Sequence, residues 1–303
     1  MKLQAVELTK SFGEKAVLRG VSFCAEGGKA LGLLGRNGAG KTTTIRIIMN
    51  VFSADNGQVL LDGIPFDAEK YKIGYLPEER GLYPKKEIMP QLIYFGELAG
   101  LSKAQAKQNA QMLLEKLQMS EYAGKRLETL SKGNQQKIQL VATLISNPDI
   151  VILDEPFSGL DPVNAMLLKD LIKELISKGK IVLFSSHQMN YIEEFCDEIA
   201  VLNCGEIVLS GNIREIKRKF ERNTVEIVTT DTAKVSEYLR IVNADIIKNM
   251  NIDGDKISVF LEKPENKDRL FSSLSEYGEY IDSFSVKEPS LNEIFVKYTE
   301  GNV

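Results

Sequence analysis

The sequence predicts an α/β fold built on a parallel sheet, followed by a smaller α+β domain. Three short and almost uninterrupted apolar runs, at 30–34, 149–153 and 180–184, are typical of strands that are buried on both faces. The first two runs are each followed by a segment with apolar residues at helical spacing, as a parallel sheet requires. Beyond residue 223 the expected order is strand, helix, strand, strand, helix, strand, which is the order of a ferredoxin-like sandwich.

Length and composition limit the classes of protein that fit. The chain has 303 residues, of which 43% are apolar, enough for one large domain or two. Its formal net charge is −4 and acids and bases are interspersed, so no basic face for nucleic acid is expected. No stretch approaches about 18 uninterrupted apolar residues and the first residues have no signal-peptide core, so the chain alone is expected neither to be secreted nor to cross a bilayer.

The cysteines indicate a reducing compartment. Cys24, Cys196 and Cys204 are odd in number and lack paired spacing, so neither a disulfide framework nor a zinc site is expected. The expected location is therefore the cytosol.

The N-terminal segment is expected to form two strands, Leu3 to Leu8 and Val17 to Phe23, joined by a polar connection from Thr9 to Lys15. Phe12 lies in that connection. An aromatic ring there can stack on a nucleobase, and the alternative is a loop aromatic tucked into the core.

A glycine-rich loop separates the apolar run at 30–34 from a helical pattern that begins near Thr43. It reads GRNGAGKT and matches GxxxxGK[ST], the phosphate-binding P-loop, whose backbone N–H groups turn toward one anion beside the positive end of a helix dipole. We expect Lys41 to reach the β- and γ-phosphates and the Thr42 hydroxyl to bind Mg²⁺. The predicted nucleotide-binding residues of the loop are Gly35, Arg36, Asn37, Gly38, Ala39, Gly40, Lys41, Thr42 and Thr43.

Two further segments carry polar groups at places where a ligand can bind. Residues 58–61 and 72–76 are expected to be strands. A charged loop begins at Glu78, and the simplest interpretation is that it lies at the solvent-exposed surface. From about 86 to 146 the pattern is helical, in three segments, and Ser131 is placed to cap the third. Such a cap leaves backbone N–H groups free at the helix start, although an ordinary cap is the alternative.

The strand at 149–153 ends in two adjacent carboxylates, Asp154 and Glu155, where an α/β sheet places its ligand chemistry. The strand at 180–184 ends just before His187, the only histidine. Taken alone, this histidine fits a surface position at a helix start, but beside a strand that ends in two carboxylates a functional role is expected.

The remainder of the chain is expected to form a hairpin at 198–210, a charged linker helix at 215–223 and the α+β domain at 224–303. No catalytic or ligand-binding motif occurs in the C-terminal domain, which suggests a regulatory or assembly role.

Taken together, these motifs resemble those of the ATP-binding subunits of ABC transporters, over about residues 1–214. GRNGAGKT resembles Walker A, IVILDEP at 150–156 resembles Walker B with its following glutamate, and SGLD at 158–161 resembles the D-loop. Ser186-His187 resembles the switch histidine, and residues 130–134 the signature sequence. GYLPEERGLYP, LSKGNQQK and EPSLNEIF further resemble the subtype found in bacterial sodium exporters and daunorubicin-resistance drug exporters.

The resemblance implies a P-loop ABC ATPase domain with a RecA-like core sheet, an antiparallel β subdomain and a helical subdomain at about 86–146. It implies ATP and Mg²⁺ as ligands, with the metal held by Thr42 and, through water, by Asp154. Glu155 would orient and deprotonate the attacking water, and His187 would keep the γ-phosphate and the glutamate in register.

The resemblance also implies a second copy of the chain, or a related ATPase subunit. The signature residues would close on the nucleotide of the opposite subunit in a head-to-tail pair, and the D-loop is a further site segment. These residues are Ser131, Lys132, Gly133 and Asn134 in the signature, and Ser158, Gly159 and Asp161 in the D-loop.

Two positions depart from the family pattern. The signature reads LSKGN where LSGGQ is common, so that Lys132 adds a positive charge and Asn134 shortens the amide arm. Glu78 occupies the place of the usual Q-loop glutamine. Its carboxylate is expected either to bind the metal more tightly or to repel the γ-phosphate when the metal is absent, so the Mg²⁺ requirement should be sharper than usual.

The leading hypothesis is the ATPase of an export complex, bound at the inner face of the membrane through a separate transmembrane permease. A soluble ATPase of DNA repair is an alternative, but such proteins contain long coiled coils and no sustained heptads occur here. A translation factor of the ABC type needs two ATPase halves, and only one P-loop is present.

Overall fold

The three apolar runs form neighbouring strands of one six-stranded sheet. The computed structural model describes residues 1–79, 81–186, 188–220 and 222–300. It divides into two compact units, the first formed by Met1–Ile213 with the residues from Lys297 onward, and the second by Arg214–Val296. The sequence places the first boundary one residue later and assigns the last turn of the chain to the C-terminal domain.

The central sheet of the first unit is parallel except for one edge strand. Every residue of β3, β7 and β8 is buried, as expected for strands covered on both faces. In spatial order its strands are β10 (Glu206–Asn212), β9 (Glu198–Asn203), β3 (Ala30–Leu34), β8 (Ile181–Ser185), β7 (Ile150–Asp154) and β6 (Ile73–Leu76).

A second, antiparallel sheet carries the N-terminus. Its strands, in spatial order, are β2 (Lys15–Glu26), β1 (Lys2–Phe12), β4 (Asn56–Leu61) and β5 (Ile64–Pro65). The prediction of a polar connection over Thr9 to Lys15 is wrong, because β1 and β2 remain paired up to Phe12 and Lys15. Alternating exposure along these strands keeps polar residues on the open face, so their polarity does not end the ladder.

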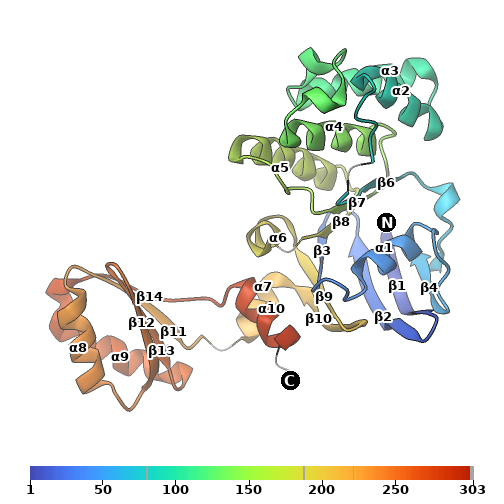
Figure 1. Ribbon diagram of the computed structural model, residues 1–303. Coiled ribbons are helices and arrows are strands. Elements are labelled where there is room, and N and C mark those ends of the chain that lie inside the picture. The colour runs from blue at the N-terminus through green and yellow to red at the C-terminus, as the bar shows by residue number, and fades with distance from the viewer. Residues whose placement is uncertain (80, 187, 221, 301–303) are drawn as a thin grey trace. The chain divides into compact units, whose positions relative to one another are not determined.

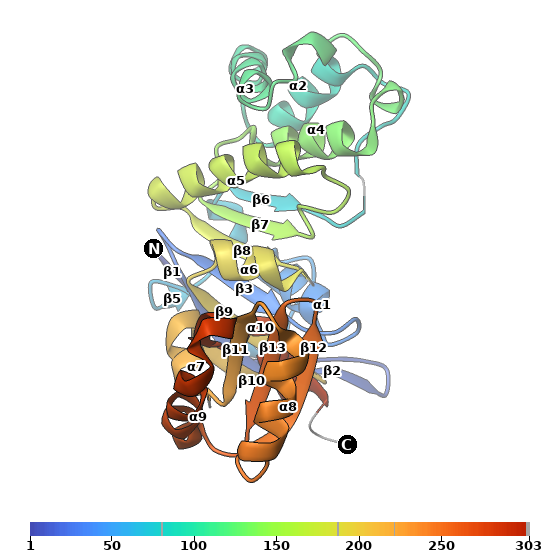
Figure 2. The same ribbon diagram turned by 90° about the vertical axis from the view of Figure 1, so that its left-hand side faces the viewer.

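Helices cover the central sheet and form a separate helical segment. Figures 1 and 2 both show α2, α3 and α4 grouped beyond β6 and β7, as the predicted helical subdomain requires. The helices of this unit are α1 (Lys41–Ile48), α2 (Ile88–Leu98), α3 (Lys103–Lys116), α4 (Lys132–Leu144), α5 (Pro162–Ser177) and α6 (Met189–Phe195).

The second unit has the predicted order of elements. Its strands are β11 (Thr224–Thr229), β12 (Ile247–Asp253), β13 (Lys256–Leu261) and β14 (Ile281–Val286), and its helices are α8 (Thr232–Val242) and α9 (Lys267–Leu274). The strands pair antiparallel in the order β12-β13-β11-β14, which is that of a ferredoxin-like sandwich. Figure 1 shows α8 and α9 on one side of the sheet, where their leucines pack on alternate residues of β11 and β13.

Two helices cross the boundary between the units along the chain. The first is α7 (Ile213–Lys219), which leads from β10 to the second unit, and the second is α10 (Leu291–Glu300), which follows β14. None of the helices among the described residues combines the length and the apolar character needed to span a bilayer.

Candidate functional site

The glycine-rich loop runs from the end of β3 to the start of α1. Gly38 and Gly40 have φ values of 80° and 115°, which side chains with a Cβ rarely adopt. A Cβ at Gly40 would lie 2.6 Å from a methyl carbon of Leu18, so a larger residue also lacks space. Gly40 stands at the N-cap of α1 without a side-chain cap, which leaves the first amides of the helix for an anion.

Lys41 lies across this loop and close to three carboxylates. Its ammonium group donates to two carbonyl oxygens of the loop itself, those of Gly35 and Arg36. Burial lowers the pKa of Lys41, while the negative charges of Asp154, Glu155 and Glu78 act in the opposite direction. These carboxylates therefore lie within electrostatic range of the lysine that is expected to hold a phosphate.

Asp154 ends β7 at the carboxyl edge of the sheet, where it pairs with Ser185 of β8. Its side chain is 7% exposed. Burial raises the pKa of the Asp154 carboxyl, and the neighbouring charges of Glu78 and Glu155 raise it further, against the opposing effects of the Ser185 hydroxyl and Lys41. A buried acid among other acids is a site that gains from a cation.

Glu155 is held in an unusual backbone conformation. Its φ is 49°, in the left-handed region that costs a non-glycine residue free energy unless its surroundings fix it. The N–H of Glu155 donates to the carbonyl of Ser185 at 2.9 Å. The Ser186 hydroxyl donates to Oε2 of Glu155 at 2.9 Å and itself accepts from the N–H of Gln188 at 3.1 Å.

Ser186 is a candidate functional residue whose contact with Glu155 the sequence did not predict. Its contact with Glu155 joins positions 31 residues apart, and the only signal in the sequence is that Ser186 precedes the single histidine. The predicted role of His187 concerns a residue that lies outside the described part of the chain.

The signature residues stand at the start of α4. The Ser131 hydroxyl accepts from the N–H of Asn134 at 3.3 Å, as predicted for an N-cap, and Lys132 is the first helical residue. A Cβ at Gly133 would lie 3.3 Å from the carbonyl oxygen of Gly159, so the signature and the D-loop of one chain lie side by side. Ser158 donates its N–H to the backbone carbonyl of Glu155, which connects the D-loop to the end of the Walker B segment.

The D-loop ends in a helix cap. The carboxylate of Asp161 accepts from the N–H of Asn164 at 3.0 Å, and this hydrogen bond lowers the pKa of Asp161. Asp161 therefore stays ionised at the start of α5.

Two groups of site residues can be distinguished by their contacts. Walker A, Walker B and Glu78 form one cluster around Lys41. Among the described residues, no hydrogen bond or ion pair joins this cluster to Ser131 or Lys132. The cluster around Lys41 and the signature start are thus connected only indirectly, through the D-loop beside Gly133, as far as the described residues show.

Glu78 follows β6 and is exposed. The carbonyl oxygens on either side of it, those of Pro77 and Glu79, accept hydrogen bonds from the side-chain amide of Gln139 at 3.5 and 3.2 Å. The loop that carries Glu78 is therefore anchored to α4.

Phe12 is 46% exposed at the end of β1. Its ring meets that of Phe52 edge to face, with centroids 5.5 Å apart. The alternative of a ring tucked into the core is wrong, and stacking on a nucleobase stays a prediction.

Arg36 of the P-loop has a partner near the end of the chain. It forms an ion pair with Glu300 in the last turn of α10. The Asn203 side chain donates to the carbonyl of Tyr298 at 3.4 Å, and Thr299 between them is 9% exposed. The last turn of α10 thus packs beside the P-loop, within the first unit.

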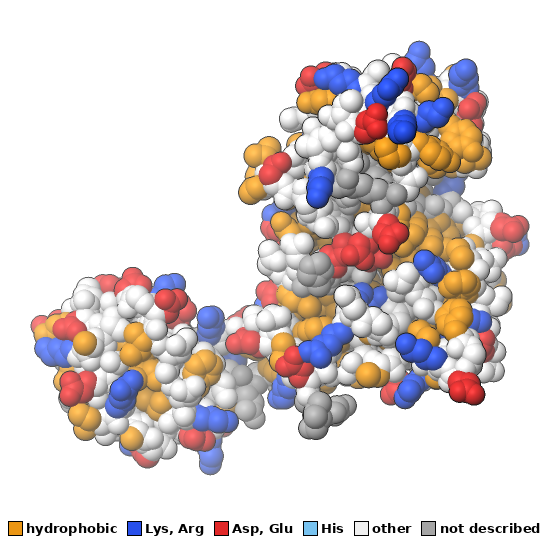
Figure 3. All heavy atoms as spheres, in the orientation of Figure 1, with side chains coloured by type: hydrophobic (Ala, Val, Ile, Leu, Met, Phe, Trp, Pro, Cys, Tyr) orange, Lys and Arg blue, Asp and Glu red, His pale blue; other side chains and the backbone are white. Residues whose placement is uncertain are grey.

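The residues present fit a magnesium ion. A hydroxyl and carboxylates are the oxygen ligands that Mg²⁺ prefers, and Thr42, Asp154 and Glu78 supply them. Figure 3 shows acidic side chains gathered midway down the first unit, below the helical segment. Within the described residues no three His, Cys, Asp or Glu side chains group closely enough to bind a metal by themselves. An ion here would therefore take its other ligands from phosphates and water.

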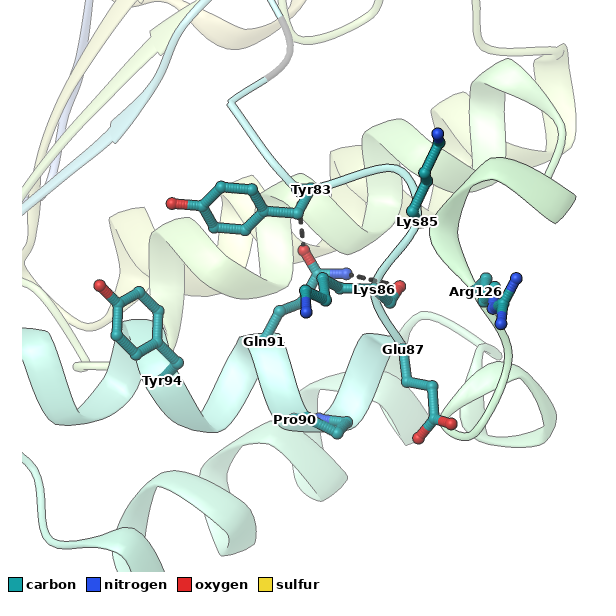
Figure 4. A pocket seen from close by; sticks show the side chains of 8 residues that line it. All are labelled: Tyr83, Lys85, Lys86, Glu87, Pro90, Gln91, Tyr94 and Arg126. Atoms are coloured by element: carbon teal, nitrogen blue, oxygen red, sulfur yellow. Dashed lines mark hydrogen bonds between the residues drawn. The ribbon is translucent and has the colours of Figure 1, made fainter.

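A groove on the helical segment lies away from these groups. It is lined by Tyr83, Lys85, Lys86, Glu87, Pro90, Gln91, Tyr94 and Arg126. Figure 4 shows Gln91 at its centre, accepting from the N–H of Tyr83 at 3.2 Å and donating to the carbonyl of Lys86 at 3.3 Å. Tyr83 and Tyr94 are 53% and 48% exposed, so the groove offers two aromatic surfaces beside positive charges.

Comparisons with known proteins show the family of the chain. A family model described as ABC transporter matches residues 18–158, and one described as ATP-binding protein DrrA1-3-like, C-terminal domain, matches residues 211–299. YhaQ of Bacillus subtilis, described as an uncharacterized ABC transporter ATP-binding protein, is 40% identical over 96% of both chains.

Two further similarities support the same conclusion. The Nod factor export ATP-binding protein I of Burkholderia lata is 30% identical over 84% of both chains. A solved structure described as the ATP binding subunit of an ABC transporter superposes with a TM-score of 0.67 at 29% identity, covering 73% of this chain and 93% of that one.

Proposed function

This chain belongs to the ATP-binding proteins of ABC transporters, which are ATPases, and from that premise we propose that it drives an export complex by ATP-dependent pairing of two copies. The observation that carries the proposal is the separation of the site residues into two groups. The cluster around Lys41 can bind a triphosphate, and the signature start at Ser131 offers a second anion site that has no anion of its own.

Hydrolysis would use the chain's own groups in defined roles. Lys41 and the loop amides hold the phosphates, and Glu155, fixed by Ser186, orients and deprotonates the attacking water. A magnesium ion held by Thr42 and Asp154, with Glu78 nearby, supplies charge neutralisation at the β- and γ-phosphates. His187 is the proposed partner of the γ-phosphate.

Pairing would complete the site. In a head-to-tail pair, Ser131, Lys132, Gly133 and Asn134 of one copy cover the γ-phosphate bound by the other, and the D-loop beside Gly133 crosses the same interface. Nucleotide that is bound by both copies stabilises the pair, and its hydrolysis releases them.

A separate permease would dock on the groove of the helical segment. Lys85, Lys86 and Arg126 give this groove a positive charge and its tyrosines give it apolar surface, which suits a short membrane-proximal segment with an acidic residue. Docking there places the chain at the inner face of the membrane. The similarity to a Nod factor export protein supports export rather than import.

The test has two steps. The purified full-length chain should hydrolyse ATP only with Mg²⁺, and Lys41→Ala should remove nucleotide binding. The chain captured from detergent extract of its own cells should bring an integral membrane protein with it, and Arg126→Glu should reduce this capture without changing basal turnover. Capture of ribosomes or DNA in place of a membrane protein would contradict the transport role.

A further inference from the structure

One face of α4 donates hydrogen bonds to loops of the nucleotide site. Gln136, Gln139 and Thr143 are spaced by three and four residues and so share a face of the helix. Their exposed fractions are 7, 4 and 9%. Buried side-chain donors at three such positions need partners. The two glutamines donate to backbone carbonyls of other segments, whereas the Thr143 hydroxyl has its shorter hydrogen bond, 3.0 Å, to the carbonyl of Gln139 in its own helix.

The acceptors lie next to the catalytic acids. Gln136 donates to the carbonyl of Pro156 at 3.4 Å, one residue after Glu155. The Thr143 hydroxyl also lies 3.3 Å from the carbonyl oxygen of Tyr75, in the strand that leads to Glu78.

Gln139 has the most informative contacts. Its single amide group donates to the carbonyls of Pro77 and Glu79, the two residues that flank Glu78. Because Gln139 is almost fully buried, water cannot readily replace it at these carbonyls, and a shift of the loop relative to α4 would leave polar groups unpaired. The loop and the helix are therefore held as one part.

The other end of α4 carries the signature. Ser131 caps the helix, and Gln139 lies eight residues further along a continuous helix, at a rise of about 1.5 Å per residue. A helix of this length transmits a displacement of its start to Gln139 with little loss.

We propose that Gln139 is a positioning residue that makes the Glu78 loop move with the signature helix. In the head-to-tail pair of the proposed function, on which this inference rests, nucleotide that engages Ser131 at one site then sets the position of Glu78 at the other. The two ATP sites of a pair are thereby connected through the side chain of each Gln139.

The experiment compares two variants of the full chain that each remove one side-chain amide group, one on α4 and one that contacts the end of α4. Gln139→Met keeps the length and volume of the side chain but donates nothing. Asn109→Ala is the matched control, because Asn109 of α3 donates to the carbonyl of Ile145 at the far end of α4, at 2.8 Å, and touches no catalytic loop.

Hydrogen exchange at the amides of Glu78 and Glu79 is the first readout, with and without ATP and in a Glu155→Gln background that retains the nucleotide. ATP should slow this exchange in the unmodified loop, and Gln139→Met should lose most of that protection while still forming the pair. With Glu155 intact, Gln139→Met should lower kcat about three- to tenfold with KM within about twofold, as expected when positioning rather than binding is lost.

The outcomes separate the inference from the proposed function. Unchanged protection in Gln139→Met, unchanged kcat, or an equal loss in Asn109→Ala overturns the role of Gln139 while leaving the ATP-dependent pair in place. Failure of the Glu155→Gln chain to pair with ATP overturns the proposed function itself.

Discussion

Removal of one hydroxyl should slow hydrolysis without weakening ATP binding. The Ser186 hydroxyl is buried, with the residue 3% exposed, and donates to the Glu155 carboxylate at 2.9 Å. Ser186→Ala leaves that carboxylate without this donor and also leaves the N–H of Gln188 without its acceptor. The backbone of Glu155 keeps its hydrogen bonds with Ser185 and Ser158 and its left-handed conformation, but its carboxylate loses the support of the Ser186 hydroxyl.

The size of the effect follows from the kind of hydrogen bond. A hydrogen bond to a charged group is worth about 1.5–3 kcal/mol. Because about 1.4 kcal/mol corresponds to a tenfold change in rate, the full loss would slow turnover by roughly ten- to a hundredfold. ATP affinity should change by less than about twofold, since the described contacts of Ser186 involve Glu155 and Gln188 and not the P-loop.

The assay is steady-state phosphate release together with an equilibrium titration of ATP. Ser186→Thr, which keeps a hydroxyl, should retain most activity. Ser236→Ala is the matched control, because that serine is 8% exposed and its hydroxyl donates to the carbonyl of Ala233 in the second unit. Turnover of Ser186→Ala within twofold of the unmodified chain would refute the reasoning.

Three further predictions concern charge and space around the site. Glu300→Gln frees Arg36 from its ion pair and should tighten ATP binding by up to about fivefold at low salt, as measured by titration; unchanged or weaker binding would count against this contact. Burial raises the pKa of Asp154, so the folded protein loses stability as the pH rises from the pKa of an ordinary aspartate through the raised pKa of Asp154. At pH 7 without Mg²⁺, Asp154→Asn should therefore unfold at a higher temperature than the unmodified chain. An equal or lower unfolding temperature would be contrary evidence. Gly133→Ala places a Cβ 3.3 Å from the carbonyl of Gly159 and should weaken pairing more than ATP binding, which sedimentation and titration can separate.

The local pattern of apolar residues was enough to predict the main strands and helices of both units. The runs at 30–34, 149–153 and 180–184 are uninterrupted because those strands are buried on both faces, and the P-loop lies between β3 and α1 as its spacing indicates. The order of elements after residue 223 predicted the ferredoxin-like topology, because each element is short and its apolar residues follow a clear helical or strand period.

The contacts that fix the site were not predictable in the same way. Ser186 with Glu155, Gln139 with the loop around Glu78, and Arg36 with Glu300 join residues 31, 60 and 264 positions apart. The hydrophobic periodicity of a segment does not predict contacts with distant parts of the chain, and serine, glutamine and glutamate are common surface residues.

Two differences in the elements have local causes. The prediction ended β1 too early because its polar residues on the open face resemble a loop. Helix α6 was not predicted, since its seven residues are too few for a helical period to stand out.

The most direct test of the account is the association state of Glu155→Gln in sedimentation velocity. With saturating ATP and Mg²⁺ this variant should sediment as a dimer, and it should return to a monomer when ATP is withdrawn or when Lys41→Ala is added. A Glu155→Gln chain that binds ATP and remains monomeric would contradict the claim that nucleotide is held between two copies.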